Sequence, residues 1–332
     1  MNFITPSPID CVLAITYRCN SRCLMCNIWQ IKNPATIDPA EYRKLPASLR
    51  DINISGGEPF LHPKITEVVK ILRETCPHAR IVISSNGFAS GLIETKMKEI
   101  LLIDKNIGIA FSLDGIGEMH NRVRQIPGGF EKVMDSLARV KKLGMTNIRL
   151  AFTILSENVS HFGKVYDLAR ENGVEFTEAF AQSSEHYFGG KQIVNQPNYA
   201  ELKKQYEYVI NQELKSGKIK SWLRAYFAFG LYQFVVEKKQ ILNNDPGTKF
   251  FFLDPSGDVY PSVVHNYPMG NIRTVQKWGE LWQGAMAGGA REQVYSVGQP
   301  AWMICTARTA IRRHALRVLV WILRGKFFGV SL

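Results

Sequence analysis

Strand-like and helix-like segments alternate along the first 180 residues of this 332-residue chain. Short apolar runs typical of buried strands are separated by segments with apolar residues at helical spacing. This alternation predicts a parallel sheet, because parallel strands need a crossover connection, usually a helix, between them. The predicted strands are Cys11–Tyr17, Asp51–Ser55, Arg80–Ser84, Ile107–Ser112, Ile148–Ile154 and Val174–Phe180.

Helices are predicted between these strands, for example at Ile65–Glu74, Phe130–Leu143 and Phe162–Glu171. Gly144 and Gly173 follow two of them and are typical helix stop signals. The hydrophobic content of 45% and the charged content of 21% are ordinary for a globular protein. We therefore predict an α/β fold, and the length allows either one large domain or a domain plus an appendage.

Three closely spaced cysteines follow the first predicted strand. Cys19, Cys23 and Cys26 form a C-x3-C-x2-C run. Three thiolates this close can bind three irons of a [4Fe–4S] cluster and leave the fourth iron without a protein ligand, whereas a cluster that only transfers electrons normally has four cysteine ligands. A zinc site or three unrelated thiols are the alternatives.

A glycine-rich turn, Gly56-Gly57-Glu58-Pro59, follows the second predicted strand. With the cysteine run, it resembles the signature of the radical S-adenosylmethionine (SAM) superfamily. The resemblance covers residues 11–180 and implies an open (β/α)6 partial TIM barrel. It also implies one [4Fe–4S] cluster bound by the three cysteines, with SAM held against Gly56, Gly57, Glu58 and Pro59.

The resemblance further implies a reaction. In this superfamily the reduced cluster donates one electron to SAM, and the resulting 5′-deoxyadenosyl radical abstracts a hydrogen atom from a substrate. The expected protein is an oxidoreductase-type enzyme that needs an electron donor such as flavodoxin or ferredoxin. Cluster assembly needs reduced thiols, so a cytoplasmic location is expected. The alternative to an enzyme is a degenerate, non-catalytic protein that uses the barrel only as a scaffold.

Further residues at the strand ends are candidates for the SAM site by the same resemblance. They are Ser85, Asn86, Ser112, Asp114 and Arg124. Simple turn capping is the alternative for Ser85, Asn86 and Asp114, because such residues commonly stabilise turns. Arg124 could pair with the SAM carboxylate through a bidentate fork, or form a surface salt bridge. His120 is expected to be a solvated helix residue.

Beyond the barrel, residues 183–248 are predicted to be a helical connecting region with helices at Tyr199–Leu214 and Trp222–Val236. The pattern of residues 249–261 predicts a β-hairpin that turns at Pro255–Gly257. This hairpin opens a segment, residues 249–307, that resembles the twitch or SPASM extension of radical SAM enzymes.

Cysteines expected in such an extension are missing here. Ser262 and Ala301 stand at two of their positions, and only Cys305 remains in the segment Pro300–Cys305. Since one thiolate cannot hold a second cluster, we predict a degenerate extension with no auxiliary cluster. Cys11 and Cys76 are predicted to be buried structural cysteines.

Half of the net charge of +12 lies in the tail, residues 308–332. A basic amphipathic helix is predicted over Thr309–Phe328, too short in its apolar run to span a membrane. The helix could dock on the barrel with solvated arginines, or bind the inner face of a membrane peripherally. Nucleic-acid binding is not expected, because no basic motif interleaved with aromatic residues appears.

The expected substrate is a small or lipid-linked metabolite, for instance a sugar or a glycan precursor. The basic, apolar tail and the missing auxiliary cysteines motivate this expectation. A peptide is the alternative substrate, because many relatives with such extensions modify peptides.

Overall fold

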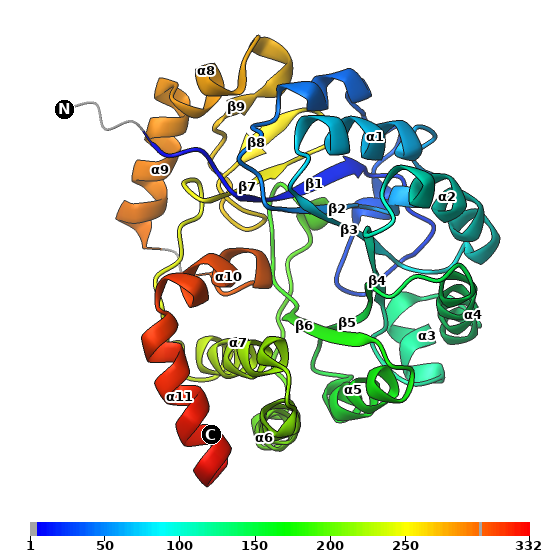
Figure 1. Ribbon diagram of the computed structural model, residues 1–332, viewed down its shortest axis with the longest axis vertical. Helices are drawn as coiled ribbons and strands as arrows, with labels where there is room; N and C mark the ends of the chain where they lie inside the picture. The colour runs from blue at the N-terminus through cyan, green and yellow to red at the C-terminus, as the bar shows by residue number, and fades with distance from the viewer. Residues whose placement is uncertain (1–4, 299–300) are drawn as a thin grey trace.

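The computed structural model describes residues 5–298 and 301–332. Their strands form a nine-stranded sheet in the order β6-β5-β4-β3-β2-β1-β7-β8-β9 (Figure 1). The strands are β1 (Asp10–Thr16), β2 (Asp51–Gly56), β3 (Arg80–Ser85), β4 (Gly108–Ser112), β5 (Ile148–Ile154), β6 (Glu175–Phe180), β7 (Phe250–Leu253), β8 (Asp258–Tyr260) and β9 (Gly270–Asn271). Strands β1 to β6 pair in parallel and in chain order, which confirms the predicted open (β/α)6 partial barrel.

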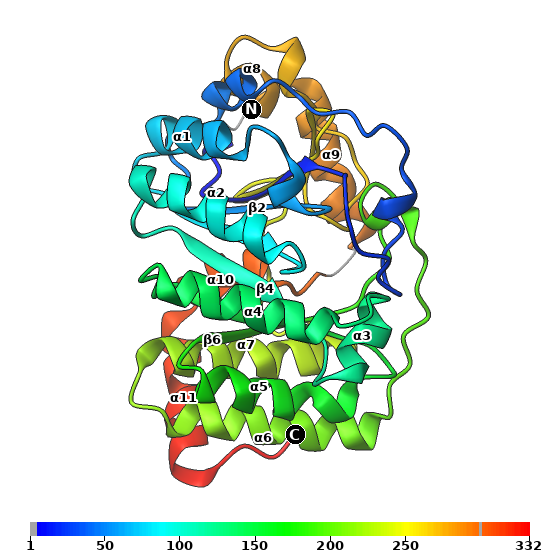
Figure 2. The same ribbon diagram turned by 90° about the vertical axis from the view of Figure 1, so that its right-hand side faces the viewer.

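Helices that follow the first strands cover the outer face of the sheet, toward the viewer in Figure 2. They are α1 (Ile65–Thr75), α2 (Ser90–Ile103), α3 (Glu118–Arg124), α4 (Gly129–Lys142) and α5 (Phe162–Glu171). In α1, Val68, Val69 and Leu72 are buried, which is the pattern of an amphipathic helix on a sheet. Gly144 and Gly173 have φ values of +81° and +67°, so the predicted helix stops are confirmed.

Two long helices follow β6. They are α6 (Tyr199–Lys215) and α7 (Ile219–Val235), and α7 also packs against β6. Short 3₁₀ helices occur at Ile28–Gln30, Pro39–Lys44, Pro59–Leu61, Val159–His161, Phe188–Gly190 and Ile272–Thr274. Among the described residues, no helix combines the length and the apolar character needed to cross a bilayer.

The predicted hairpin exists as β7 and β8, which pair antiparallel. Its first strand also pairs in parallel with β1, with Phe250 beside Asp10, so the hairpin continues the barrel sheet. Both faces of β7 are covered, which explains its unbroken run of buried phenylalanines. Phe251, for example, packs on Trp278 of α8 (Trp278–Trp282), and α9 (Ala285–Val297) follows.

The prediction of a single helix over Thr309–Phe328 is wrong. The chain forms α10 (Ile304–Arg313) and α11 (Ala315–Phe328), with a break at His314. The two helices dock on different surfaces, since α10 contacts β1 and α7 while α11 contacts α6 and α7. One straight helix could not reach both surfaces, and apolar periodicity alone does not show this.

Candidate active site

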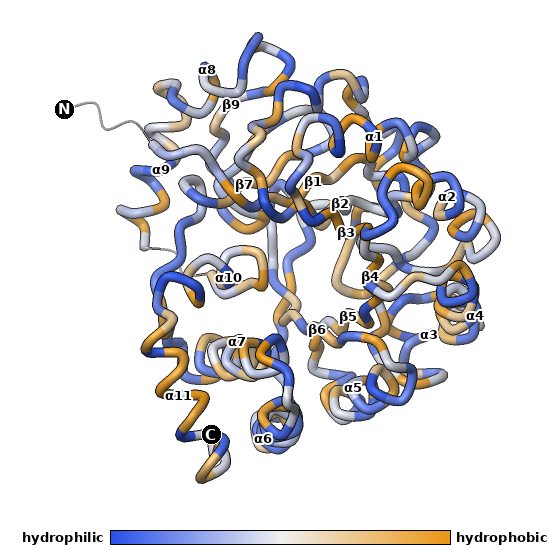
Figure 3. Tube along the Cα trace, viewed as in Figure 1, coloured by the Kyte–Doolittle hydropathy of each residue, from blue (hydrophilic) through white to orange (hydrophobic). Residues whose placement is uncertain are grey.

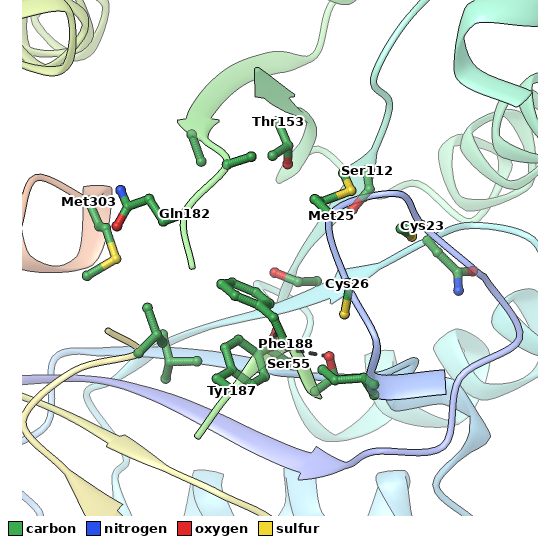
Figure 4. A pocket seen from close by; sticks show the side chains of 18 of the residues that line it. Cys23, Met25, Cys26, Ser55, Ser112, Thr153, Gln182, Tyr187, Phe188 and Met303 are labelled. Atoms are coloured by element: carbon green, nitrogen blue, oxygen red, sulfur yellow. Dashed lines mark hydrogen bonds between the residues drawn. The ribbon is translucent and has the colours of Figure 1, made fainter. Parts of the chain in front are cut away.

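A cavity of about 340 Å³ lies at the carboxyl ends of the parallel strands. We call it the upper cavity. It is lined by residues from the ends of β2 to β6, including Ser55, Ser85, Ser112, Thr153 and Phe180. This edge of a parallel barrel is where catalytic groups gather, because the loops after the strands converge there. Figure 4 shows the cavity from close by.

The three cysteines of the C-x3-C-x2-C run all line the upper cavity. Cys23 and Cys26 lie on one side of it, across from Met303 (Figure 4). Helix α3 holds their loop, because Leu24 donates its amide hydrogen to the Val123 carbonyl oxygen over 3.0 Å. The Cys23 sulfur also lies 3.0 Å from the Ser21 hydroxyl.

The donor set of this loop fits the iron–sulfur cluster that the sequence predicts. None of the three cysteines is in a disulfide, and thiolates are the usual ligands of such clusters. Burial raises the pKa of Cys19 to about 12 and that of Cys26 to about 11. Iron binding must therefore displace protons from these thiols. The described residues hold no group of three His, Cys, Asp or Glu side chains arranged around one metal ion. The fit of the loop to a cluster therefore rests on two facts: all three cysteines line the same cavity, and thiolates bind iron.

The glycine-rich turn packs on the start of the cysteine loop. The Gly57 amide donates to the Thr16 carbonyl oxygen over 2.7 Å, and the Glu58 amide donates to the Arg18 carbonyl oxygen over 2.8 Å. A Cβ atom on Gly56 would lie 2.2 Å from the Thr16 oxygen, and one on Gly57 would lie 2.4 Å from the Arg18 oxygen. Only glycine allows this close approach, which places both glycines in the cavity wall.

Substituting Gly57 with alanine is expected to disturb both the fold and the site. The new methyl group would meet backbone rather than a flexible side chain, and relieving such overpacking costs about 1–3 kcal/mol. Thermal unfolding and SAM binding of the reconstituted protein measure the effect. Gly91→Ala is the control, because Gly91 lies in α2 and a Cβ atom added there would meet nothing within 4 Å beyond its own stretch of helix backbone. Equal behaviour of the two variants would contradict the packing role.

Glu58 and Pro59 position the site rather than line it. Both are buried and neither borders the upper cavity. The Glu58 carboxylate accepts hydrogen bonds from the Asn86 amide at 2.7 Å and from the Ser85 hydroxyl at 3.0 Å. Ser85 and Asn86 do line the cavity, and Asn86 also contacts the cysteine loop through the Asn20 side chain at 2.7 Å. Glu58 thus ties the turn after β3 to the turn after β2.

Stability should depend on pH through Glu58. Burial raises the pKa of Glu58 to about 7, above its usual value of 4.5. The folded protein then binds more protons than the unfolded chain between these values, so the free energy of unfolding should fall as pH rises through this window. The loss of unfolding free energy across this window is roughly 3 kcal/mol. Urea unfolding from pH 4 to 8 should show a flatter profile for Glu58→Gln than for wild type; identical profiles would contradict the assignment.

Asp114 and His120 differ from their predicted roles. Asp114 is completely buried and does not border the upper cavity. Its carboxylate pairs with Arg124 Nε at 2.5 Å and accepts the Thr153 amide at 2.7 Å. His120 is buried rather than solvated, and its Nδ1 accepts the Asp114 amide at 3.0 Å. Burial lowers the pKa of His120 to about 3.

Arg124 lines the upper cavity, so a surface salt bridge is excluded. Its Nη1 donates to the Cys23 sulfur over 3.5 Å. Asp114 therefore fixes a guanidinium beside the cysteine loop, and Arg124 is the member of this pair that a bound molecule can reach. Ser112, also predicted from the sequence, lines the same cavity.

Part of the cavity wall was missed from the sequence. Tyr187 and Phe188, which follow β6, face the cysteine side, and Trp302 and Met303 border the cavity from the other end of the chain. Tyr187 donates its hydroxyl hydrogen to the Gly56 carbonyl oxygen over 3.2 Å, which links this segment to the glycine-rich turn. The aromatic run before two consecutive glycines at 189–190 was the available signal.

The positions of the missing extension cysteines are buried. The Ser262 hydroxyl lies 2.6 Å from His265 Nδ1, and Ala301 is almost fully covered. Cys305 borders the upper cavity, and burial raises its pKa to about 12. Pro300 lies outside the described residues. Cys11 and Cys76 are fully buried, as predicted.

Comparison with known proteins agrees with this geometry. Residues 13–169 match the family model of the radical SAM superfamily. This part of the chain is therefore a radical SAM domain, and its cofactors are a [4Fe–4S] cluster and SAM. Members of this superfamily related to the chain are enzymes.

Three curated relatives span different shares of the chain. Pre-heme d1 synthase of Dinoroseobacter shibae is 24% identical over 84% of this chain and 74% of its own length. Fe-coproporphyrin III synthase of Methanosarcina barkeri is 30% identical over 48% of this chain, and the Bacillus subtilis sporulation killing factor maturation protein SkfB is 28% identical over 50%. The matched region spans only 40% of each of the latter two proteins.

Solved structures share the fold. SuiB of Streptococcus suis bound to S-adenosylmethionine superposes with a TM-score of 0.64 at 16% identity, covering 86% of this chain and 68% of that one. The protein anSMEcpe with bound AdoMet gives a TM-score of 0.62 at 14% identity, covering 96% and 99%. At these identities the likeness concerns the fold alone.

Proposed function

We propose that this protein is a radical SAM enzyme whose substrate binds in the upper cavity. The observation that carries the proposal is the meeting of the three free cysteines and both glycines of the glycine-rich turn on one cavity wall. When bound, the cluster and SAM would supply a 5′-deoxyadenosyl radical able to abstract a hydrogen atom from the substrate. The cavity walls would exclude water and orient the bond to be broken.

The side chains around the cysteine loop divide into polar and apolar groups. Asn86, Ser112 and Arg124 offer hydrogen-bond donors that suit the polar groups of SAM. The ion pair with Asp114 fixes the orientation of Arg124, so its guanidinium needs no reorganisation when an anionic carboxylate binds. Tyr187 closes the wall next to the glycine-rich turn.

The rest of the wall favours a substrate with an apolar or conjugated body. Val263, Trp302, Met303 and Ile304 border the cavity on the sides away from the cysteine loop. Lipid-linked metabolites, expected from the sequence, have such a body. Tetrapyrroles have one too, and the names of two relatives, pre-heme d1 synthase and Fe-coproporphyrin III synthase, refer to tetrapyrroles. A bare sugar would leave this wall unused. A peptide is the second candidate, supported by the relative SkfB, a peptide maturation protein by its name.

Anaerobic reconstitution with iron and sulfide, followed by dithionite and SAM, tests the proposal. We expect 5′-deoxyadenosine by mass spectrometry, and more of it when the right substrate is present. Coproporphyrin III, a lipid-linked sugar and an unmodified peptide are the probes to compare. Flavodoxin or ferredoxin should replace dithionite as the electron donor. A fully loaded protein that never cleaves SAM with any probe would contradict the proposal.

We also propose that α11 binds a membrane surface peripherally. Helix α11 buries Val318 and Ile322 and packs on α6 and α7, yet an apolar strip on its other side stays exposed. That strip is Leu316, Leu319, Val320, Leu323, Phe327 and Phe328. Figure 3 shows apolar residues along α11 interrupted by polar ones. Arg317 and Arg324 are exposed on the same helix, which suits anionic headgroups.

Replacing both Leu319 and Leu323 with glutamate should abolish flotation with anionic vesicles. These leucines are 47% and 46% exposed, so the fold should tolerate the change, while two carboxylates oppose insertion and anionic lipid. The control is Leu102→Glu on α2, because Leu102 is 91% exposed and lies outside α11. Equal flotation by the double variant, or by protein lacking the tail, would exclude membrane contact through α11.

A further inference from the structure

A second, basic cavity lies at the opposite ends of the barrel strands. It has a volume of about 140 Å³, and we call it the lower cavity. A middle cavity of about 200 Å³ shares lining residues with both the lower and the upper cavity. Six cationic side chains line the lower cavity: Arg80, Arg149, Lys220, Arg224, Arg308 and Arg312. They come from β3, β5, α7 and α10, so only the tertiary fold brings them together.

The parallel register gathers charge at this edge of the sheet. Asp10, Asp51 and Arg80 are the first residues of β1, β2 and β3 and lie side by side. Arg149 of β5 lies beside Glu175, the first residue of β6. Such a row of charges at the strand starts needs compensation from outside the sheet, and α7 and α10 supply most of the cations.

Two of the three carboxylates at this edge, Asp51 and Glu175, are each shared by several cations, and Asp10 pairs with Arg308. Arg308 contacts both Asp10 and Asp51 at 2.9 Å, and Asp51 also pairs with Arg80 at 2.5 Å. Glu175 pairs with Arg224 at 2.5 Å and with Lys220.

The lower cavity therefore has an excess of positive charge. Arg312 lies 3.7 Å from the already shared Asp51, and Arg149 lies 3.7 Å from the already shared Glu175. Six cations thus face three ion-pairing carboxylates. Glu178 also borders the cavity, but even with its carboxylate counted the six cations outnumber the carboxylates six to four, and burial raises the pKa of Glu178, which favours its neutral form.

Arg149 is the least satisfied of these cations. Its side chain is 13% exposed, and its buried Nε has no hydrogen-bond partner. Burial, with repulsion from Arg224 and Arg80, lowers the pKa of Arg149 to about 10. A buried cation with an unpaired donor is costly, and an anion is what would relieve it.

We propose that the lower cavity binds a small ligand through a phosphate or carboxylate group, held by Arg149 together with Arg224 and Arg308. Arginine guanidiniums match both groups through paired hydrogen bonds. The site does not depend on the radical chemistry of the upper cavity. It also gives the basic tail a role inside the protein, because Arg308 and Arg312 belong to that tail and line the cavity.

Isothermal titration of the intact chain with inorganic phosphate, and separately with succinate, tests the proposal. Chloride should keep the ionic strength constant, because non-specific attraction is screened by salt. Saturable binding of either anion is expected. Tighter binding of phosphate would assign a phosphate ligand, tighter binding of succinate would assign a carboxylate ligand, and equal binding would support a general anion site. No saturable heat from either anion would overturn the proposal.

Three variants locate the binding site. Arg149→Met should raise the dissociation constant of the bound anion about ten-fold or more, because charge-assisted hydrogen bonds are lost. Lys220→Met, at the half-exposed rim, should raise it several-fold and covers the case in which Arg149→Met does not fold. Arg139→Met is the matched control, since Arg139 pairs with Asp135 and Glu94 outside the cavity. Wild-type affinity in both Arg149→Met and Lys220→Met would overturn the assignment. If Arg149→Met does not fold, wild-type affinity in Lys220→Met alone would overturn it.

Discussion

Replacing Cys23 with alanine should abolish production of 5′-deoxyadenosine. Cys23 is one of three thiols available to the cluster on the wall of the upper cavity, and two remaining thiols cannot hold a cubane with one open iron. We expect at least a 100-fold loss of product, because the reductive step needs the cluster. The measurements are iron content, visible absorption and 5′-deoxyadenosine after dithionite and SAM.

Cys76→Ala is the matched control for this loss. Cys76 is also a free cysteine, but it is buried at the end of α1 and does not border the upper cavity. Its variant should keep the iron content and the product yield of wild type, apart from a small loss of stability. Product from Cys23→Ala at the wild-type level, or equal losses in both variants, would contradict the role of the cysteine loop.

Asp114→Asn should destabilise the fold by about 3–5 kcal/mol, the usual cost of leaving one member of a buried ion pair alone. The partner, Arg124, is itself buried and would keep its charge without the 2.5 Å contact to Asp114. The asparagine can still accept the Thr153 amide, so the substitution mainly removes the charge. Urea unfolding of the cluster-free protein measures the change.

A double variant separates the ion pair from general damage. Asp114→Asn combined with Arg124→Met removes both charges, so it should be less destabilised than Asp114→Asn alone. It should nevertheless bind SAM poorly once the cluster is loaded, because Arg124 is the cation beside Cys23. Losses of stability that simply add would contradict the coupling of these two side chains.

Much of the barrel was predictable because its signals are local. Strand Ile148–Ile154 and helix Phe162–Glu171 have the predicted bounds, since apolar periodicity and the following Gly173 are contained in neighbouring residues. The cysteine run and the glycine-rich turn were recognisable for a related reason. The chemistry of each needs particular residues at short spacing, and no other part of the chain changes that requirement.

The roles of individual polar residues were less predictable. Glu58 and Asp114 follow strands, as residues that touch SAM would, yet their carboxylates are used to hold Asn86 and Arg124. Whether a carboxylate faces a cavity or a neighbouring loop depends on partners that are 28 and 10 residues away. Sequence spacing does not show which of these competing hydrogen bonds forms.

The sequence alone determined the class of this protein: a parallel α/β barrel with three thiols and a glycine-rich turn after its first two strands. Only the tertiary structure decided what surrounds that chemistry. The aromatic wall from residues 187–188 and 302–303, the break between α10 and α11, and the six cations of the lower cavity all join segments distant in sequence. Such groupings arise from packing between elements, and packing depends on surfaces that form only when the whole chain folds.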